Sequence, residues 1–293
     1  RVNYIKGPLK YEVCLTNQCN QHCLHCSNGL INKTSIFNCE SMKPILDQEP
    51  VMIVLTGGEP LLHPQINSLI SMIKKQGAFL KLCTNGIGLT EVVCNDLADR
   101  FEKYDIIQIS FDAADKETYA RIRGSAYFDK LLENIQTVRR KLPEATIELH
   151  CVPNRYNLRQ MLQIYTLAKA LGANIFSTAP LAYLGRAKRE YQADILSLLQ
   201  LERDLYRYSD NHTRYIGRLF EICSLYGVLQ PPYSQVIAKD NVYRCDAGLS
   251  TMYIDCDEEV YPCVYLKEQA FRLGYLKEGL PILIARARAR YIH

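Results

Sequence analysis

The strongest constraint on the fold is a repeated alternation of short apolar segments with longer amphipathic ones. The short segments are rich in β-branched residues and read as buried strands at 11–16, 51–56, 79–84, 106–112, 146–152 and 174–178. Stretches of helical length lie between them, for example at 64–75, 91–101, 128–141 and 158–171. Consecutive strand–helix units require a parallel sheet with right-handed crossovers. Six units are too few to close an eight-stranded barrel, so the sequence predicts an α/β fold with a curved, partial (βα)6 barrel.

The pattern changes after Pro180, where this alternation stops. Residues 190–227 read as helical, the stretch Gln230-Pro-Pro-Tyr233 interrupts them, and residues 243–265 read as short strands around a turn. We therefore expect three parts, a barrel core at 1–187, a helical linker region at 188–235 and a small C-terminal extension at 236–293.

The composition excludes several classes of protein. The net charge of the 293 residues is only +4, and the one basic cluster, Arg286-Ala-Arg-Ala-Arg290, reads as a solvated helix face. No apolar run reaches the roughly 18 residues of a membrane span, and the first residues lack the apolar core of a signal peptide. We expect a cytoplasmic protein that binds neither nucleic acid nor a membrane.

The chain contains twelve cysteines, a high number for its size. It is too large and too rich in apolar residues for a small disulfide-stapled scaffold, so the count points to metal binding or thiol chemistry in a reducing compartment. Two groups stand out, at residues 14–26 and 245–263. The scattered cysteines are expected to be small buried apolar residues; they are Cys39, Cys83, Cys94, Cys151 and Cys223.

Three closely spaced cysteines directly follow the first predicted strand: Cys19, Cys23 and Cys26. Parallel α/β folds place their chemistry at the carboxyl ends of strands, so this loop lies where an active site is expected. Iron–sulfur clusters are usually held by four thiolates, so three would leave one iron open, as in catalytic metal sites. A zinc site that adds Cys14, or His22 and His25, is the alternative.

The spacing C-x3-C-x2-C after a first strand resembles the signature of the radical S-adenosylmethionine (radical SAM) superfamily. In that superfamily the three cysteines hold a [4Fe–4S] cluster, and the amino and carboxylate groups of S-adenosylmethionine (SAM) chelate the open iron. The resemblance implies a TIM-like partial barrel. It also places His25 where the family usually has an aromatic residue that packs near the adenine.

A glycine-rich turn at the end of the second predicted strand is similar to the GGEP motif of the same superfamily, which binds the methionine amino group. The turn comprises Gly57, Gly58, Glu59 and Pro60. Glycines allow backbone carbonyls to approach a ligand closely, and a carboxylate complements an ammonium group. A turn of this kind that follows a strand and the cysteine motif is a far more specific signal than the turn alone.

Two further matches end the third and fourth predicted strands. Asn85 belongs to a Thr-Asn-Gly sequence that resembles the family's TNG, which lies close to the cofactor. Ser110 and Asp112 resemble the family's S-x-D, in which the serine lies near the methionyl or ribose oxygens. Read without the family, Asn85 is a turn residue and Asp112 caps a helix.

Three arginines complete the set of residues that the resemblance implies for cofactor binding. Arg121 and Arg123 lie in a segment similar to one whose arginine reaches the cofactor carboxylate, so either one is a candidate. Arg186 lies in a Leu-Gly-Arg-Ala sequence that recurs in relatives with C-terminal clusters. For Arg121 and Arg123, the alternative interpretation is that they are surface charges.

The second group of cysteines resembles the opening of a SPASM or twitch domain, which delivers two ligands to an auxiliary iron–sulfur cluster. Cys245 and Cys263 take the ligand positions, Glu258 replaces a usual turn glycine, and Cys256 is an additional thiol. The cysteines that complete such clusters do not follow before His293, so Cys256, an exogenous ligand or further chain would complete the site. A zinc site is the alternative.

The resemblance implies an enzyme that reductively cleaves SAM to a 5′-deoxyadenosyl radical, which abstracts a hydrogen atom from the substrate. An electron donor such as flavodoxin or ferredoxin would reduce the cluster. The cofactor carries the difficult chemistry, and the protein binds, orients and excludes water.

Relatives with such extensions modify ribosomally made peptides or proteins through cross-links, thioethers or epimerisation, and this is the function we expect. The alternative is an epimerase or dehydrogenase of a small molecule such as a sugar or cyclitol. A remote alternative is a non-catalytic metal-binding module. In an epimerase, Cys256 is our candidate hydrogen-atom donor, because a thiol S–H bond is weaker than most C–H bonds.

Overall fold

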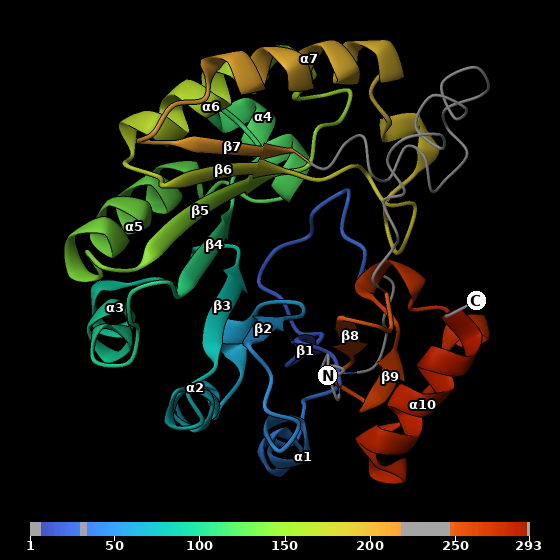
Figure 1. Ribbon diagram of the computed structural model, residues 1–293. Helices are drawn as coiled ribbons and strands as arrows, with labels where there is room; N and C mark the ends of the chain where they lie inside the picture. Colours follow the sequence, from blue (N-terminus) through green and yellow to red (C-terminus); the bar gives the residue numbers. More distant parts are fainter. Residues whose placement is uncertain (1–6, 30–33, 218–246, 292–293) are drawn as a thin grey trace.

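The computed structural model describes residues 7–29, 34–217 and 247–291, which form a ten-stranded sheet with helices packed outside it (Figure 1). The strands are β1 (Lys10–Cys14), β2 (Met52–Thr56), β3 (Phe79–Thr84), β4 (Ile106–Ser110), β5 (Thr146–Cys151), β6 (Ile175–Thr178), β7 (Arg214–Gly217), β8 (Thr251–Ile254), β9 (Glu259–Tyr261) and β10 (Gly274–Tyr275). The helices are α1 (Lys43–Leu46), α2 (Ile66–Lys75), α3 (Glu91–Ala98), α4 (Lys116–Arg123), α5 (Phe128–Lys141), α6 (Met161–Ala170), α7 (Ile195–Tyr208) and α10 (Leu280–Tyr291).

The strand order is β10-β9-β8-β1-β2-β3-β4-β5-β6-β7, and every neighbouring pair from β8 to β7 is parallel. The strands from β1 to β6 lie in chain order, as expected for consecutive strand–helix units. β7 and β10 form the two edges, so the sheet is open, and Figure 1 shows that it is curved. The prediction of a partial, TIM-like barrel with these six strands is therefore confirmed.

The core lies between the sheet and the helices outside it. Successive side chains on a strand point to opposite faces, so alternate residues of β3, β4 and β5 are fully buried on the helix side. Leu82, Ile109 and Leu149 belong to one continuous apolar cluster with Ile73 of α2 and Ile135 of α5. Burial of each such side chain contributes about 1.5–3 kcal/mol to folding.

The inner face of the sheet is polar. Lys81 on β3, Gln108 on β4 and Glu148 on β5 occupy the positions that alternate with the apolar ones. Lys81 and Glu148 form an ion pair whose N–O distance is 2.6 Å. Strands that are covered on both faces usually carry apolar residues on both, so this polar lining suggests that the interior serves binding or chemistry as well as packing.

The short strands predicted around a turn at 243–265 appear within the described part of that stretch as β8 and β9. β8 joins the barrel sheet, because it pairs in parallel with β1 from Lys10 opposite Thr251 to Val13 opposite Ile254. β9 pairs antiparallel with β8, and α10 packs its Leu283 against the same apolar core. The division of the chain near residues 187 and 235 stays a prediction.

One prediction from the sequence is wrong. The sequence predicts a helix over residues 214–217, but these residues form β7, which pairs in parallel with β6. The helical reading is correct for Ile195–Tyr208, which form α7. A strand of four residues is too short to show a clear alternation, and its pairing partner, β6, lies about 40 residues earlier in the sequence.

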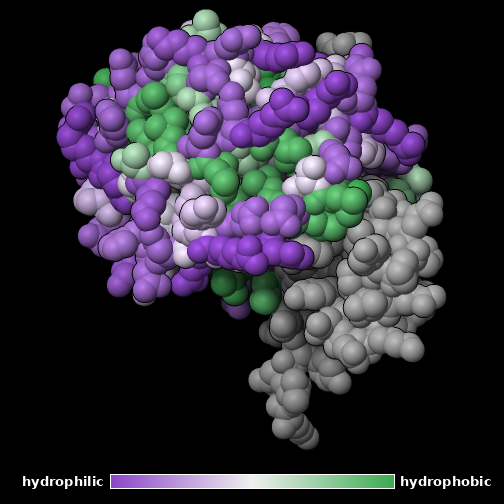
Figure 2. Space-filling model, turned by 90° about the horizontal axis from the view of Figure 1, so that it is seen from above, coloured by the Kyte–Doolittle hydropathy of each residue, from purple (hydrophilic) through white to green (hydrophobic). Residues whose placement is uncertain are grey.

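Figure 2 shows the molecule from above, the side on which α7 lies in Figure 1, with hydrophilic side chains over most of this face. Apolar residues of α6 and α7, among them Leu162 and Leu196, line a shallow groove between these helices. In the described ranges, none of the helices combines the length and the apolar character that crossing a bilayer requires.

Candidate active site

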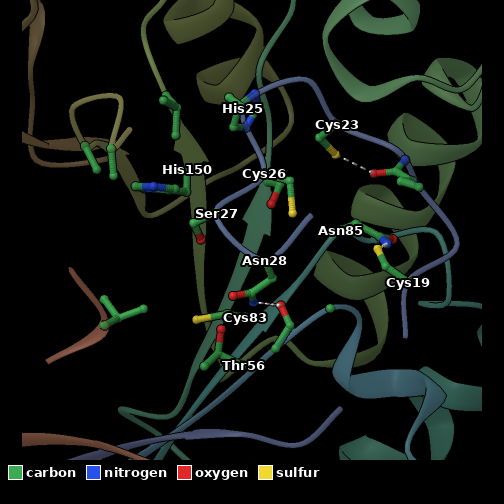
Figure 3. Close-up of a pocket in the computed structure, with 18 of the residues that line it drawn as sticks. Cys19, Cys23, His25, Cys26, Ser27, Asn28, Thr56, Cys83, Asn85 and His150 are labelled. Atoms are coloured by element: carbon green, nitrogen blue, oxygen red, sulfur yellow. Dashed lines mark hydrogen bonds between the residues drawn. The ribbon is translucent and has the colours of Figure 1, made fainter. Parts of the chain in front are cut away.

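A cavity of about 270 Å³ lies at the carboxyl ends of the parallel strands (Figure 3). Parallel strands bring residues that are distant in sequence to one edge of the sheet, and nine of the predicted site residues line this cavity. They are Cys19, Cys23, His25, Cys26, Gly57, Gly58, Asn85, Ser110 and Arg123.

The glycine turn after β2 packs directly on the backbone of the cysteine loop. The N–H of Gly58 donates to the carbonyl of Thr16 at 2.6 Å, and the N–H of Glu59 donates to the carbonyl of Gln18 at 2.7 Å. A Cβ on Gly58 would lie 2.1 Å from the Gln18 carbonyl oxygen, which no side chain tolerates. Gly57 has a φ of +138°, and a Cβ on it would lie 2.4 Å from the carbonyl oxygen of Thr16. These glycines are therefore required by the approach of two backbones.

Two other segments hold the same loop. The N–H of Leu24 donates to the carbonyl of Ile122 in α4 at 2.9 Å. The N–H of Arg186 donates to the carbonyl of Cys26 at 2.9 Å, and its Nε donates to the carbonyl of Cys23 at 3.0 Å. Arg186 does not line the cavity, and instead fixes the backbone that carries the thiols.

The three thiols surround the cavity without meeting at one point. Nδ2 of Asn85 contacts Sγ of Cys19 at 3.8 Å, and Sγ of Cys23 contacts Oε1 of Gln21 at 3.9 Å. Burial raises the pKa of Cys19, and it raises the pKa of Cys23 to about 11, so metal binding must displace their protons. Among the described residues, no three metal-binding side chains lie close enough together to hold a single ion.

A buried charged group connects the cysteine loop to the end of β4. Arg123 donates to Oδ2 of Asp112 at 3.0 Å and to Oε1 of Gln21 at 3.1 Å. Burial alone would raise the pKa of Asp112, but His25, Arg123 and the N–H of Val152 together hold it below its usual value. Asp112 itself is buried behind the cavity lining, where it orients Arg123.

The side chain of His25 is 10% exposed, and its Nε2 lies 3.7 Å from Oδ2 of Asp112. Burial is the main reason why the pKa of His25 is lowered. Among the described residues, its Nδ1 has no hydrogen-bond partner. A buried ring nitrogen without a partner beside a cavity is an unmet hydrogen-bonding group that a ligand would satisfy.

The carboxylate of Glu59 does not reach the cavity. The side chain is completely buried and accepts hydrogen bonds from Oγ1 of Thr84 at 2.7 Å, the N–H of Asn85 at 2.7 Å and the N–H of Leu61 at 3.2 Å. Burial raises the pKa of Glu59. In this structure Glu59 therefore holds Asn85 in place, and its neighbour Pro60 begins a short helical turn outside the cavity lining.

Three of the remaining candidates, Arg121, Cys256 and Cys263, do not line the cavity. The guanidinium of Arg121 stacks on the ring of Tyr156, 4.0 Å from its centroid. Cys256 is buried in a small cluster with Cys14 and Tyr253. Cys263 is itself absent from the lining but directly precedes two lining residues, Val264 and Tyr265. Cys245 lies outside the described residues.

In a comparison with known protein families, residues 13–168 match the family described as the radical SAM superfamily. This range is more than half of the chain and includes the cysteine loop, the glycine turn and the residues after β3 and β4. The chain belongs to the radical SAM superfamily. It is accordingly an enzyme, and the cofactors of the superfamily are a [4Fe–4S] cluster and SAM.

Among individual proteins, this radical SAM chain is 31% identical over 221 residues to the PqqA peptide cyclase of Streptomyces rochei. The matched region covers 73% of this chain and 59% of the cyclase. It is 24% identical over 284 residues to the AdoMet-dependent heme synthase of Methanosarcina barkeri, with 88% of the chain and 79% of the synthase covered. The chain thus spans about three-fifths of the length of the cyclase.

Solved structures share the fold. SuiB of Streptococcus suis, crystallised with S-adenosylmethionine, superposes with a TM-score of 0.74 at 16% identity and covers 93% of this chain and 64% of SuiB. A structure titled native anSMEcpe with bound AdoMet gives a TM-score of 0.74 at 18% identity, with 97% and 83% covered. The prediction of a radical SAM fold is confirmed.

The residues around the cavity fit the superfamily's cofactors. A [4Fe–4S] cluster binds each thiolate to a different iron, so ligands that surround a cavity suit it. Three thiols line this cavity together, and the unpartnered Nδ1 of His25 adds a polar group that a bound molecule would meet. Thus Cys19, Cys23 and Cys26 are the chain's candidates to hold the cluster.

The sequence does not predict several of the residues that line the cavity. Cys83, Gln108 and His150 line the cavity from the inner face of β3, β4 and β5. Cys83 was expected to be a buried apolar residue, as Cys39, Cys94 and Cys151 are. The available signal was the appearance of polar residues at alternate positions in strands that otherwise read as buried.

Proposed function

We propose that the chain reductively cleaves SAM and abstracts a hydrogen atom from a ribosomally made peptide or protein, so that a cross-link, thioether or epimer forms. Two observations on relatives support a peptide substrate. One relative is named a PqqA peptide cyclase, and SuiB has been crystallised bound to the precursor peptide SuiA. The cavity, lined by the three thiols of one loop, is the observation that carries the cleavage step.

When bound, the cluster and SAM supply a 5′-deoxyadenosyl radical. The chain's own residues bind and orient them: Cys19, Cys23 and Cys26 hold the cluster, and the backbone of Gly57 and Gly58, with Ser110 and Arg123, forms the walls against which SAM is placed. Nδ2 of Asn28 already donates to the carbonyl of Gly57 at 3.1 Å, which fixes the orientation of that carbonyl (Figure 3). His25 and Asn85 complete the proposed cofactor site.

The C-terminal segment is proposed to hold an auxiliary iron–sulfur cluster through Cys245 and Cys263. Support comes from the position of Cys263 beside the cavity lining. Cys256 stays our candidate for a further ligand or, in an epimerase, for a hydrogen-atom donor. A low-potential protein such as flavodoxin or ferredoxin is the proposed electron donor, and the cytoplasm is the proposed location.

The cleavage step is tested by substituting the three thiols one at a time. We expect Cys19→Ala, Cys23→Ala and Cys26→Ala to form no 5′-deoxyadenosine after anaerobic reconstitution and reduction with dithionite. Cys39→Ala, which removes a buried thiol away from the cavity, is the matched control and retains its iron and its activity. Parental cofactor cleavage in any one of the three variants contradicts the assignment.

The substrate class is tested by searching the neighbouring genes for short precursor peptides, co-expressing any that are found with the enzyme, and analysing each peptide by mass spectrometry. A mass change of −2 Da indicates a cross-link or thioether, and deuterium uptake from heavy water indicates epimerisation. An enzyme that cleaves SAM but alters none of these peptides favours the alternative, an epimerase or dehydrogenase of a small molecule. The polar inner face of the sheet would then be its binding surface.

A further inference from the structure

The inner face of the barrel carries a connected chain of hydrogen bonds that ends at the cavity. Nδ1 of His150 lies 2.8 Å from Oγ of Ser177, Oγ of Ser177 donates to Oε1 of Glu148 at 2.6 Å, and Nζ of Lys81 contacts Oε2 of Glu148 at 2.6 Å. His150 and Glu148 lie two residues apart on β5, so both face the interior, and Ser177 lies opposite His150 on β6.

The state of Glu148 determines the direction of these hydrogen bonds. Burial alone would raise its pKa, but Lys81, His150 and two hydrogen bonds hold the pKa of Glu148 below its usual value. Glu148 is therefore a carboxylate at neutral pH and only accepts hydrogen bonds. The hydroxyl proton of Ser177 must point to Glu148, so the Ser177 oxygen accepts from the ring of His150.

This arrangement assigns the tautomer of His150. Its Nδ1 carries the proton that is donated to Ser177, so in the neutral ring Nε2 carries the lone pair. A carboxylate that acts on a histidine Nδ1–H through a hydroxyl both orients the ring and stabilises the imidazolium that forms when Nε2 takes a proton. The structure thus contains a histidine prepared to act as a base.

The position of His150 matches this role. It lines the same cavity as the three thiols of the cysteine loop. In Figure 3, Cys19 and Asn85 lie on one side of the view and His150 on the other, with Cys26 between them. His150 thus lines the cavity on the side away from Cys19, beside Ser110, its register partner on β4.

We propose that His150 is the general base that removes a proton from the substrate, with Ser177 and Glu148 as positioning residues. The proposal rests on the proposed function and adds to it a substrate group with an N–H, O–H or S–H bond at the modified site. That bond breaks, its electron pair stays on the substrate atom, and the proton moves to Nε2 of His150. No electron is transferred in this step.

The base is first tested without a peptide. The reconstituted enzyme is treated with diethyl pyrocarbonate, which modifies unprotonated imidazole nitrogens, and the modified histidines are mapped by mass spectrometry. We expect His150 to be modified in the parent enzyme, and its rate of modification to fall several-fold in Ser177→Ala and Glu148→Gln. The rate at the exposed His212 is the internal reference. An unmodified His150, or a rate that neither variant changes, overturns the proposal even if no peptide substrate is found.

The catalytic role is then measured as the amount of modified peptide formed per 5′-deoxyadenosine. A general base contributes roughly 100-fold to 10,000-fold, so His150→Gln should lower this ratio by at least about 100-fold and Ser177→Ala by less. His212→Gln is the matched control and keeps the parental ratio. Added imidazole should restore part of the ratio in His150→Ala. A parental ratio in His150→Gln refutes the base, whereas a parent enzyme that modifies no peptide refutes only the proposed function.

Discussion

The contact between the glycine turn and the cysteine loop leads to a prediction with a matched control. Gly58→Ala would place a Cβ 2.1 Å from the carbonyl oxygen of Gln18, and the other nearest atoms also belong to the backbone of the loop. No flexible side chain can move aside, so the loop itself must shift by more than an ångström. We expect this shift to break the hydrogen bonds from Gly58 to Thr16 and from Glu59 to Gln18.

The magnitude follows from these contacts. Overpacking costs about 1–3 kcal/mol, and each lost backbone hydrogen bond about 1 kcal/mol, so Gly58→Ala should lower the free energy of unfolding by about 3–5 kcal/mol. Gly77→Ala is the control: Gly77 has a φ of +81° but nothing within 4 Å of its Cβ position. Its backbone strain alone should cost roughly 1–2 kcal/mol.

Urea unfolding of the cluster-free proteins, followed by circular dichroism, measures both values. Iron per chain after anaerobic reconstitution provides the functional readout. We expect Gly58→Ala to bind less than half of the parental iron, because its cysteine loop is displaced, and Gly77→Ala to bind as much as the parent. If the two variants lose equal stability and both bind full iron, the reasoning about close backbone approach fails.

Two more predictions concern stability. Asn134 on α5 donates to the carbonyls of Gly86 at 2.8 Å and Ile87 at 3.0 Å. Asn134→Ala should therefore lower the free energy of unfolding, measured in urea, by about 2 kcal/mol. Gln136→Ala, at an exposed position of the same helix, is the control and should leave it almost unchanged. Burial raises the pKa of Asp255 to about 6, so folding favours the neutral form of this carboxyl group. The stability that the neutral carboxyl group contributes is therefore lost as the pH rises through 6. Asp255→Asn keeps the acceptor for both backbone N–H groups and should add about 1–2 kcal/mol at pH 8 but nothing at pH 4; an equal gain at both pH values contradicts the assignment.

The sequence predicted the six central strands and nine residues of the cavity lining because both depend on local signals. The strand segments are short apolar runs bounded by glycine or polar turns, and the motifs follow strands whose carboxyl ends must meet. The clustering of Cys19, Gly58, Asn85 and Ser110 then follows from parallel topology alone.

The features that could not be predicted depend on contacts between distant segments. Pairing of β8 with β1 joins the two ends of the chain, and no periodicity reports it. The sequence reading expected Glu59 to meet the cofactor, but which way its side chain turns depends on Thr84 and Asn85, whose donors reach it only in the folded state. His150 was missed because the alternating polar residues of β5 gain meaning only when Ser177 is placed opposite His150 in the folded sheet.

The β1–β8 pairing also has a consequence for how the protein is made. β1 leads directly into the cysteine loop, yet one of its edges stays unpaired until the strand that contains Thr251 has been synthesised. During that interval the nascent chain exposes an open strand edge, which can pair with other chains. Such distant pairings also form slowly. We therefore expect iron insertion to succeed mainly after release from the ribosome, and chains that stop before β8 to aggregate rather than accumulate as a smaller working enzyme.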